Sequence, residues 1–520
     1  MTSVQGAAHH EVAEIRERAV QALCDPQYAD IVDLVVWVED QITYAANSVG
    51  RVRWAEAGRE VVSGDDPIGS EDPMAFLPYT EELANPSPAR STDNAYPYPR
   101  VRLLSFFSDP ERSPDLAIVH TPQHDFRDQG GHLGEHGSLD LIQSRAPWVL
   151  SGLGVRREGF VDDHARLVDV GPTLAHLAGV PLEHLVDLDG NPLDGSPRLD
   201  YFDNTEPRRV IGILWDGGAS GEVLCGAEEG WLPNVARLIE RGLAFRGGAI
   251  AEFPSITLTN HTAILTGVGP GRHGVMGNVY YDRVKQEQVV PNDQSTWHRS
   301  AEWLHDSVKT IFEMVNDHAE APGPVRTASI DEAIDRGADY STMGLMRETG
   351  ESTTDALDDF LPPVDSPYRT SDEFEWDGWF TWSQRVDDLG LQQILDLWAD
   401  PAQAPRLTWW SNIVSDAGHH EGGPRSAQGR EGLIQSDRRL GVFLDHLEQA
   451  GVLDEVTILL TADHGFEAAD PSVTGSWQGA LDSLGVPYRE EGPNPGLVYF
   501  GIEGGRCFGD DASTQHSADD

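Results

Sequence analysis

The chain has 520 residues, and its 86 acidic residues outnumber its 37 basic ones, which gives a formal charge of −49. A surface this acidic repels nucleic-acid phosphates, so a broad electrostatic grip on DNA or RNA is excluded. No run approaches 18 apolar residues and no basic, apolar leader opens the chain, so we expect no membrane span and a cytoplasmic protein. The three cysteines lie far apart, which argues against a disulfide framework and a thiolate metal site.

The first 200 residues show short apolar runs separated by polar loops. The predicted elements here are a helix over 11–23, strands over 31–38, 41–46 and 51–54, a helix near 79–84 within the loop 62–100, strands over 115–120 and 146–150, and a helix over 168–177. The loop between the strands at 115–120 and 146–150 is dense in His and Gly. Residues 196–207 are polar and indicate a linker.

Longer elements alternate in the rest of the chain. The predicted strands cover 209–215, 407–414, 456–461 and 496–500, and the predicted helices include 232–241 and 432–450. Continuous apolar strands of this kind are typical of central parallel strands buried on both faces. The alternation of strands and helices therefore predicts an α/β fold with a largely parallel sheet.

Three of the apolar strands are followed by a carboxylate. These carboxylates are Asp216, Asp416 and Asp463. The carboxyl ends of parallel strands meet at one edge of a sheet, where ligands bind. One Asp at a strand end is usually a helix cap or turn residue. Three of them, two followed closely by histidine, are typical of a site for Zn²⁺, or for Mn²⁺ when oxygens dominate.

The stretch from Pro254 to His261 reads as a strand end, a turn and the start of a helix. Hydroxyl groups at Ser255, Thr257 and Thr259 lie near this predicted helix N-terminus, where free backbone N–H groups favour an anion. Such a hydroxyl either caps the helix, the commoner role for Ser and Thr, or attacks a phosphorus atom.

The segment from Asp216 to Asn278 resembles the type I phosphodiesterase/nucleotide pyrophosphatase branch of the alkaline phosphatase superfamily. The matching features are Asp216-Gly217, Leu232-Pro233-Asn234, Thr257-x-x-Asn260-His261, Thr266-Gly267 and Pro270-x-x-His273-Gly274, together with the segments around Asp416 and Asp463. The resemblance implies an alkaline-phosphatase-like fold: a central, mostly parallel sheet with helices on both faces and a small cap region.

The resemblance also implies two divalent metal ions, most often Zn²⁺ with Mn²⁺ as an alternative, and a threonine nucleophile. The implied first site is Asp216, Thr257, Asp463 and His464, with Asp416 and His420 in the second. Asn260 is expected to donate to a non-bridging phosphate oxygen. Thr257 is preferred over its neighbours because it lies four residues before His261.

His420 is preferred as a ligand because it lies four residues after Asp416 and four before Pro424. The family more often has Gly directly before this ligand, and here Gly418 precedes His419, so both histidines stay open.

In the family, the last metal-binding His follows the Asp-His-Gly motif and lies in a Gly-x-His-Gly turn. No such turn follows Gly465 in this chain, so one ligand of the implied second site is missing there. Gly134-Glu135-His136-Gly137, near the front of this chain, matches that turn, and the Arg-Ala-Pro strand after it matches as well. The resemblance therefore implies that His136 is the last ligand and that the chain is circularly permuted. The alternative is an ordinary Gly-rich turn in a separate N-terminal domain.

Permutation sets the expected domain organisation. The expected units are 10–200 as the C-terminal half of the fold with 30–100 as a small β-rich lobe, 201–207 as linker, 208–505 as the N-terminal half with 280–400 as insert or cap, and 506–520 as a disordered tail.

The expected function is hydrolysis of phosphodiester or pyrophosphate bonds in nucleotide-like or other small substrates, through a phosphothreonine intermediate. The alternatives are a C–P bond hydrolase resembling phosphonoacetate hydrolase, a phosphomonoesterase, a phosphosugar mutase of the same superfamily, or a non-catalytic metal- or phosphate-binding protein. We expect no nucleic-acid polymer and no membrane as partner. Trp376, Trp379, Trp382, Trp409 and Trp410 are either core residues, the preferred interpretation, or stacking surfaces for a base.

Overall fold

The computed structural model describes residues 2–77, 81, 93–125, 132–293, 295–321, 323–349, 361–362, 366–369, 378–492, 494–501 and 505–506. The predicted tail 506–520, the helix near 79–84 and Trp376 fall wholly or mostly outside these residues. Within them, no helix is both long and apolar enough to cross a bilayer.

The α-helices are α1 (Thr2–Leu23), α3 (Pro99–Phe106), α4 (Leu141–Ser144), α5 (Val170–Ala178), α6 (Ser220–Glu229), α7 (Pro233–Glu240), α8 (Thr257–Thr266), α9 (Pro270–His273), α10 (Ile311–His318), α11 (Thr342–Thr349), α13 (Gly378–Leu397), α14 (Val414–Gly422), α15 (Ala427–Gln449) and α16 (Gln478–Asp482). The strands of the central sheet are β8 (Trp148–Gly152), β9 (Gly159–Val161), β11 (Arg209–Trp215), β12 (Gly242–Phe245), β16 (Thr327–Ile330), β17 (Tyr340–Ser341), β18 (Leu407–Asn412) and β19 (Val456–Thr461).

The other strands are β1 (Val32–Glu39), β2 (Ile42–Ala46), β3 (Gly50–Ala55), β4 (Gly58–Gly64), β5 (Leu116–His120), β6 (Gly134–Glu135), β7 (Arg145–Ala146), β10 (Ala165–Arg166), β13 (Ala249–Ile250), β14 (Tyr280–Asp282), β15 (Glu287–Val289), β20 (Glu467–Ala468), β21 (Tyr488–Glu491), β22 (Gly496–Phe500) and β23 (Gly505–Arg506).

The central sheet has the strand order β17-β16-β18-β11-β19-β8-β12-β9. Its middle strands β16, β18, β11 and β19 run parallel, and β8 pairs antiparallel with both β19 and β12. The predicted α/β fold with a mostly parallel sheet is therefore confirmed. Because β8 and β9 come from the first 200 residues, the front of the chain supplies two strands to this sheet.

Helices cover both faces of the central sheet because β11 is apolar on both sides. Val210 and Leu214 pack with α5 in one core cluster, whereas Ile211 and Ile213 pack with α7 and α15 in another. Burial on two faces is the reason that β11 reads as an unbroken apolar run. The structure thereby carries the end of β11, and the Asp that follows it, into the interior.

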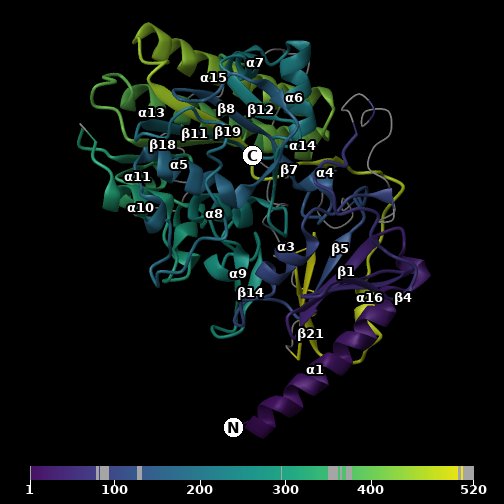
Figure 1. Ribbon diagram of the computed structural model, residues 1–520. Coiled ribbons are helices and arrows are strands. Elements are labelled where there is room, and N and C mark those ends of the chain that lie inside the picture. The colour runs from purple at the N-terminus through teal and green to yellow at the C-terminus, as the bar shows by residue number, and fades with distance from the viewer. Residues whose placement is uncertain are drawn as a thin grey trace.

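A second eight-stranded sheet joins the two ends of the chain. Its order is β23-β21-β22-β5-β1-β2-β3-β4, and β22 pairs with β5. Figure 1 shows the C-terminal strand β21 in yellow beside the purple and blue strands β1 and β5, below the central sheet. The expected lobe over 30–100 is thus completed by the C-terminal strands.

The strand predicted over 407–414 stops at Asn412, and Val414 begins α14. Asp416 therefore lies in the first turn of a helix, where a carboxylate interacts favourably with the helix dipole. The long helices α6 and α13 had no specific prediction from the sequence.

Candidate active site

Loops from both halves of the chain meet at the carboxyl edge of the parallel strands. Asp216 follows β11, Asp416 stands just after β18, and Asp463 with His464 follows β19. The pairing of β11 with β18 and β19 in parallel register sets these three strand ends side by side. The three carboxylates therefore lie together at this edge of the sheet, as expected from the sequence.

Thr257 is the first residue of α8, after the extended N-cap residue Ile256, and its side chain is 8% exposed. His261 lies one turn further along the same face of the helix. The Nε2 atom of His261 is 3.6 Å from Asp216 Oδ2 and 3.6 Å from Asp463 Oδ2. The start of α8 is thereby held beside the carboxylates.

The two other hydroxyl groups of the turn have different surroundings. Ser255 Oγ donates to the Ser138 carbonyl at 2.7 Å and accepts from Gly137 N at 3.2 Å, so it ties the turn to the His136 loop. Thr259 is fully buried inside α8, and its hydroxyl has no hydrogen-bond partner among the residues that the structure describes. Thr257 is the least buried of the three residues, because Ser255 and Thr259 are both fully buried.

The expectation that Asn260 donates to a phosphate oxygen needs correction. Both hydrogens of its side-chain amide are used inside the turn, since Nδ2 donates to the carbonyls of Pro254 at 3.0 Å and Ile256 at 3.1 Å. Its Oδ1 atom accepts from Glu252 N at 2.7 Å. Asn260 is fully buried and shapes the turn that presents Thr257.

Asn278 is a residue that sequence reasoning did not single out. Its Oδ1 atom accepts from Leu258 N at the start of α8, at 3.2 Å, and its side chain is partly exposed. It therefore lies against the first turn of the helix that begins with Thr257. Only the fold brings it there, because 20 residues separate it from Leu258.

Four side chains form the centre nearest to α8. His464 Nε2 lies 3.1 Å from Asp463 Oδ2, 3.6 Å from Asp216 Oδ1 and 4.0 Å from Asp416 Oδ1. All four are at most 5% exposed. Asp216, Asp416 and His464 form one group whose ligand atoms could surround a metal ion, and Asp216, Asp463 and His261 form another.

His136 joins a second centre with Asp416 and His420. His136 Nε2 is 3.1 Å from His420 Nε2, and His420 Nε2 is 3.7 Å from Asp416 Oδ1. The sequence places His136 284 residues before His420, yet the fold brings their ring centroids to 5.0 Å from each other. Asp416 Oδ1 lies between the two centres.

The histidines are oriented alike. His136, His420 and His464 each place Nδ1 3.0 Å from a backbone carbonyl, of Ser255, Gly134 and Gly465 respectively. A carbonyl only accepts, so the network assigns the proton to Nδ1 in each ring. The lone pairs on Nε2 are left facing the carboxylates, which is the second-sphere arrangement of metal-binding histidines.

Unsatisfied polar atoms test whether metal ions fit this cluster. The buried atoms of this cluster that have no hydrogen-bond partner within the described part of the chain are Asp216 Oδ1, His261 Nε2, Asp416 Oδ1, Asp463 Oδ2 and His464 Nε2. Buried orphan polar atoms are costly, about 1–3 kcal/mol each. Divalent cations would satisfy all of them, and the donor set of carboxylates and imidazoles suits Zn²⁺ or Mn²⁺. The residues present therefore fit two divalent cations.

The pKa shifts of His136 and His420 agree with this fit, whereas the Asp463 carboxylate raises the pKa of His464 against the effect of burial. Burial, followed by the Asp463 carboxylate, raises the pKa of Asp216, and burial with Asp216 and Asp463 raises the pKa of Asp416 well above its usual value. Burial lowers the pKa of His136 and of His420 well below the usual range. Both rings are therefore neutral near pH 7, the form that binds metals.

The geometry separates His420 from His419, which the sequence left open. His419 Nδ1 is 3.0 Å from the Gly217 carbonyl and its Nε2 is 3.0 Å from Glu222 Oε2, so it faces away from Asp416. Phe466 packs between the two sides, with its ring 4.8 Å from that of His420 and 5.1 Å from that of His419.

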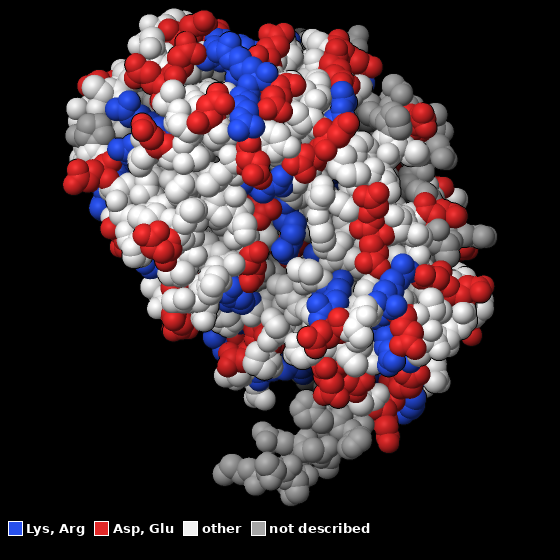
Figure 2. Space-filling model, viewed as in Figure 1, with Lys and Arg blue, Asp and Glu red and all other residues white. Residues whose placement is uncertain are grey.

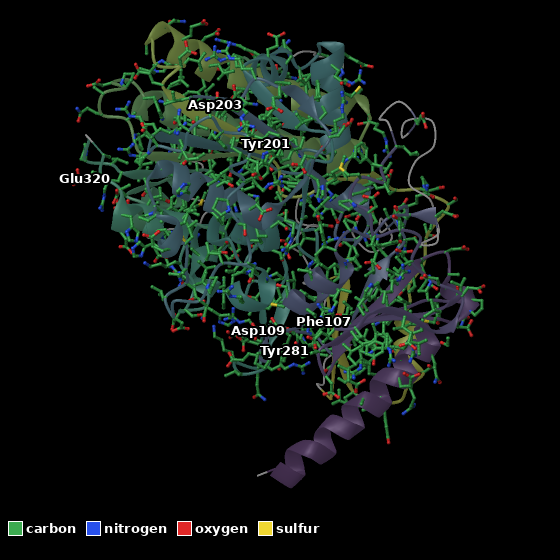
Figure 3. All side chains as sticks on the ribbon, in the orientation of Figure 1. Phe107, Asp109, Tyr201, Asp203, Tyr281 and Glu320 are labelled. Atoms are coloured by element: carbon green, nitrogen blue, oxygen red, sulfur yellow. The ribbon has the colours of Figure 1, made fainter. Side chains whose placement is uncertain are left out.

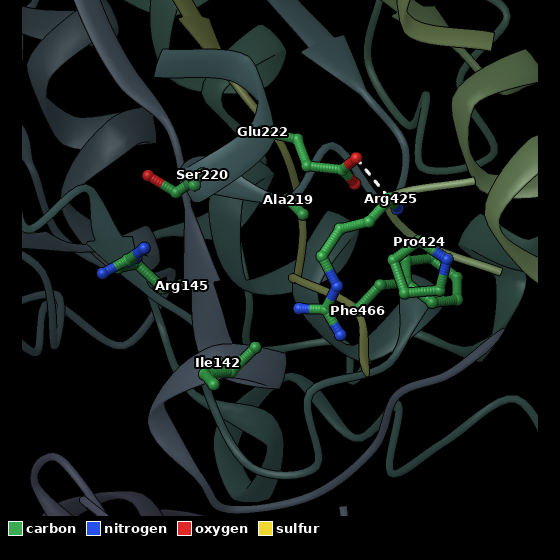
Figure 4. Close-up of a pocket in the computed structure, with 9 residues that line it drawn as sticks. Ile142, Arg145, Ala219, Ser220, Glu222, Pro424, Arg425 and Phe466 are labelled. Carbon is green, nitrogen blue, oxygen red and sulfur yellow. Dashed lines mark hydrogen bonds between the residues drawn. The ribbon is translucent and has the colours of Figure 1, made fainter. Parts of the chain in front are cut away.

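A small hollow of about 20 Å³ lies on the His419 side of Phe466. Figure 4 shows Glu222, Arg425, Arg145 and Ser220 around it. Arg425 forms ion pairs with Glu467, and its backbone N–H donates to Glu222 Oε1 at 2.9 Å. This volume suits a water molecule and not a substrate.

His261 forms a buried pair with Glu332, a contact that the sequence did not predict. Glu332 Oε2 accepts from His261 Nδ1 at 2.9 Å, from Trp409 Nε1 at 2.9 Å and from Ser411 Oγ at 3.0 Å. Burial opposes charge on His261, but the carboxylates of Glu332, Asp216 and Asp463 together outweigh it and raise the pKa of His261 well above its usual value. Glu332 thus fixes the ring that faces Asp216 and Asp463.

Replacing Glu332 by Gln is expected to lower the free energy of unfolding by about 3–5 kcal/mol, because it removes one partner of a buried pair. Urea denaturation of the metal-loaded protein measures this loss. Glu302→Gln is the matched control, since Glu302 pairs with Arg299 at the surface with both side chains more than half exposed, and should cost under about 1 kcal/mol. Equal losses for the two variants would contradict the role of Glu332.

The described tryptophans are mostly core residues, as preferred from the sequence. Trp409 and Trp410 are fully buried, and Trp382 packs against Trp297. Trp379 differs, because it is partly exposed and its ring centroid is 5.5 Å from that of His420.

Fold and site together define an α/β protein with a two-centre carboxylate and histidine cluster beside a threonine at a helix N-terminus. The family model of type I phosphodiesterase / nucleotide pyrophosphatase matches residues 210–507, more than half of the chain. The chain belongs to this family.

Curated relatives share part of the chain. An uncharacterised pyrophosphatase/phosphodiesterase of Schizosaccharomyces pombe is 25% identical over 243 residues, 45% of this chain and 41% of the relative. The venom phosphodiesterase of Naja atra is 26% identical over 239 residues, 46% of this chain and 24% of the relative. The chain thus spans less than half the length of these relatives.

Solved structures match at lower similarity. Phosphonoacetate hydrolase from Sinorhizobium meliloti 1021 is 23% identical with a TM-score of 0.32, over 50% of this chain and 57% of that chain. Murine ectonucleotide pyrophosphatase / phosphodiesterase 5 is 15% identical with a TM-score of 0.33, over the same shares.

Proposed function

We propose that this chain is a two-metal-dependent hydrolase of phosphodiester or pyrophosphate bonds that works through a phosphothreonine intermediate on Thr257. The observation that carries the proposal is a cluster of unpartnered Nε2 and carboxylate atoms beside the start of α8, which His136 joins from the front half of the chain. Family membership supports the same reaction class.

Two groups of residues would hold the cations. Asp216, Asp463, His464 and Thr257 would hold one, and Asp416, His420 and His136 would hold the other. When bound, two divalent cations neutralise phosphoryl charge and lower the pKa of a coordinated hydroxyl. His261 and Glu332 keep the Asp216 and Asp463 carboxylates in place.

The reaction then follows from the position of Thr257. The Thr257 hydroxyl gives up its proton and its Oγ atom attacks phosphorus, so that the new Oγ–P bond forms while the bond from phosphorus to the leaving oxygen breaks. The proton lost by the hydroxyl balances the one that the leaving oxygen takes up. Water next attacks the phosphothreonine, which frees Thr257 and releases a phosphomonoester. Backbone N–H groups at a helix N-terminus favour an anion, so the start of α8 would help to bind the phosphoryl oxygens.

The donors at this turn favour a singly charged substrate. Backbone N–H groups at the start of α8 and the Asn278 side chain are uncharged, which matches a diester better than a dianionic monoester. The partly exposed ring of Trp379 beside His420 supports a planar, nucleotide-like group in the substrate.

The test compares bis(p-nitrophenyl) phosphate with p-nitrophenyl phosphate. The zinc-loaded protein is expected to hydrolyse the diester faster than the monoester. It should lose this activity when a chelator is added and regain it when Zn²⁺ is restored. Release of p-nitrophenol and metal analysis are the measurements. A purified protein that binds no metal and cleaves neither ester would overturn the proposal.

We also infer that the fold is circularly permuted relative to its family. The family match begins at residue 210, and the Gly-x-His-Gly turn that carries His136 precedes it. The exposed segment around Asp203 and Asn204 would join the original ends. Locating the equivalent turn in a relative checks this order, because a position before the nucleophile would contradict permutation.

A further inference from the structure

A second polar hollow lies at the opposite edge of the central sheet from the candidate active site. It has a volume of about 310 Å³ and is lined by Leu153, Pro207, Arg208, Arg209, Arg406 and Glu455. Arg209 is the first residue of β11, whereas Asp216 follows the last one. At about 3.3 Å per residue, the two ends of this strand are about 23 Å apart. The hollow is therefore separate from the proposed catalytic centre.

Strand pairing sets two arginines side by side in this hollow. Val210 pairs with Leu407 in parallel register, and Val210 N donates to the Arg406 carbonyl at 2.9 Å. Arg209 comes directly before Val210 and Arg406 directly before Leu407, so the two arginines lie at adjacent positions of neighbouring strands. Like charges on adjacent strands repel each other. Burial, followed by the charge of Arg209, lowers the pKa of Arg406. Guanidinium groups nevertheless stay charged, so the repulsion persists.

The guanidinium groups of the hollow have no anionic partner among the described residues. Arg208 donates to the carbonyls of Glu206, Leu153 and Asn204, and Arg406 donates to the carbonyl of Glu320. Figure 3 shows Glu320 at the edge of the molecule.

Of Arg208, Arg209 and Arg406, Arg209 makes the fewest side-chain interactions. Within the described part of the chain its side chain makes no hydrogen bond or ion pair, and its buried Nε atom has no partner. Glu455 lines the hollow but forms no ion pair in the same part of the chain. The orphaned Nε atom points to a missing acceptor.

This lack of pairing is unusual for such an acidic chain. Figure 2 shows acidic and basic side chains interspersed over the visible face. Arginines elsewhere in the chain are paired with carboxylates: Arg237, for example, forms ion pairs with both Asp445 and Glu448 at 2.7 Å. Carboxylates are abundant elsewhere, yet Arg209 and Arg406 form no ion pair within the described residues, although Glu455 also lines the hollow. The distant negative charge is screened beyond about 8 Å at physiological ionic strength, so it does not prevent local anion binding.

We propose that this hollow binds a small anion that carries a phosphate group. Two adjacent guanidinium forks with free donors match the spread of phosphate oxygens and bind them with charge-assisted hydrogen bonds. A dianionic phosphate balances the paired charges of Arg209 and Arg406. The volume admits either inorganic phosphate or a nucleoside monophosphate.

Arginine labelling with phenylglyoxal, mapped by mass spectrometry on the metal-loaded protein, tests the site locally. Phosphate is expected to slow labelling of Arg209 and Arg406 about tenfold once it is about ten times its Kd, against sodium chloride of equal ionic strength. Stronger protection by AMP would assign the hollow to a nucleotide, and equal protection would assign it to the phosphate group alone. Arg299, which is exposed and pairs with Glu302, is the control that should show no protection.

Two variants make the test independent of catalysis. Thr257→Ala should show the same protection as the unmodified chain, so loss of activity leaves this readout intact. Arg209→Gln should abolish protection of Arg406 while diester hydrolysis stays unchanged. Labelling of Arg209 that neither phosphate nor AMP slows, or protection of Arg299 to the same extent, would overturn the proposal.

Discussion

Thr257→Ala is expected to lower kcat for a phosphodiester by about 10⁴-fold or more, because it removes the atom that attacks phosphorus. The α8 N-terminus, Asp216 and Asp463 keep their positions in this variant, so bound metal should fall little. Steady-state hydrolysis of bis(p-nitrophenyl) phosphate and metal analysis of the same sample measure the two effects. Trapping of a phosphorylated peptide that contains residue 257 is expected only with the unmodified chain.

Thr259→Ala is the matched control for this prediction. Thr259 lies in the same turn and is fully buried, and no described residue forms a hydrogen bond with its hydroxyl. Its removal should change kcat by no more than a few-fold, since a buried unsatisfied hydroxyl contributes little. If Thr259→Ala were as inactive as Thr257→Ala, or if Thr257→Ala kept most of its activity, Thr257 would not be the nucleophile.

Replacing His136 by Ala is expected to remove one of two bound metal ions and to lower kcat/KM by about 10²-fold or more. The reason is that His136 supplies one of the two imidazoles of the centre that it shares with Asp416. Metal content by mass spectrometry should fall from about two to about one per chain, and added Zn²⁺ should restore activity only at much higher concentration.

His419→Gln separates loss of a ligand from general damage to the site. His419 is as buried as its neighbour His420 but faces Glu222 and the Gly217 carbonyl. The variant is expected to be less stable yet to keep both metals. The reverse result, with metal lost from His419→Gln and kept in His136→Ala, would contradict the assignment of His136 and favour His419 as the ligand.

Much of the central sheet could be predicted from the sequence, because the apolar runs that mark its strands are short segments of consecutive residues. Strand β11 reads as an apolar run and is buried on both faces, and the Asp after it had to lie at the carboxyl edge. The same logic placed Asp463 and His464. Asn260 shows where a motif is insufficient, because the sequence gives its spacing from Thr257 but not the direction of its amide. Its hydrogen bonds to Pro254 and Ile256 depend on how the turn closes.

What the sequence by itself determined is the chemistry available: three carboxylates at strand ends, a hydroxyl at a helix start and enough histidines for two centres. Tertiary structure decided which of them meet. It selected His420 over His419 through the direction of α14, and it brought Glu332 behind His261. It also inserted β8 beside β19, which carries His136 to His420 across the length of the chain. Contacts between distant segments depend on sheet order and packing, and no periodicity along a single chain encodes either of them directly.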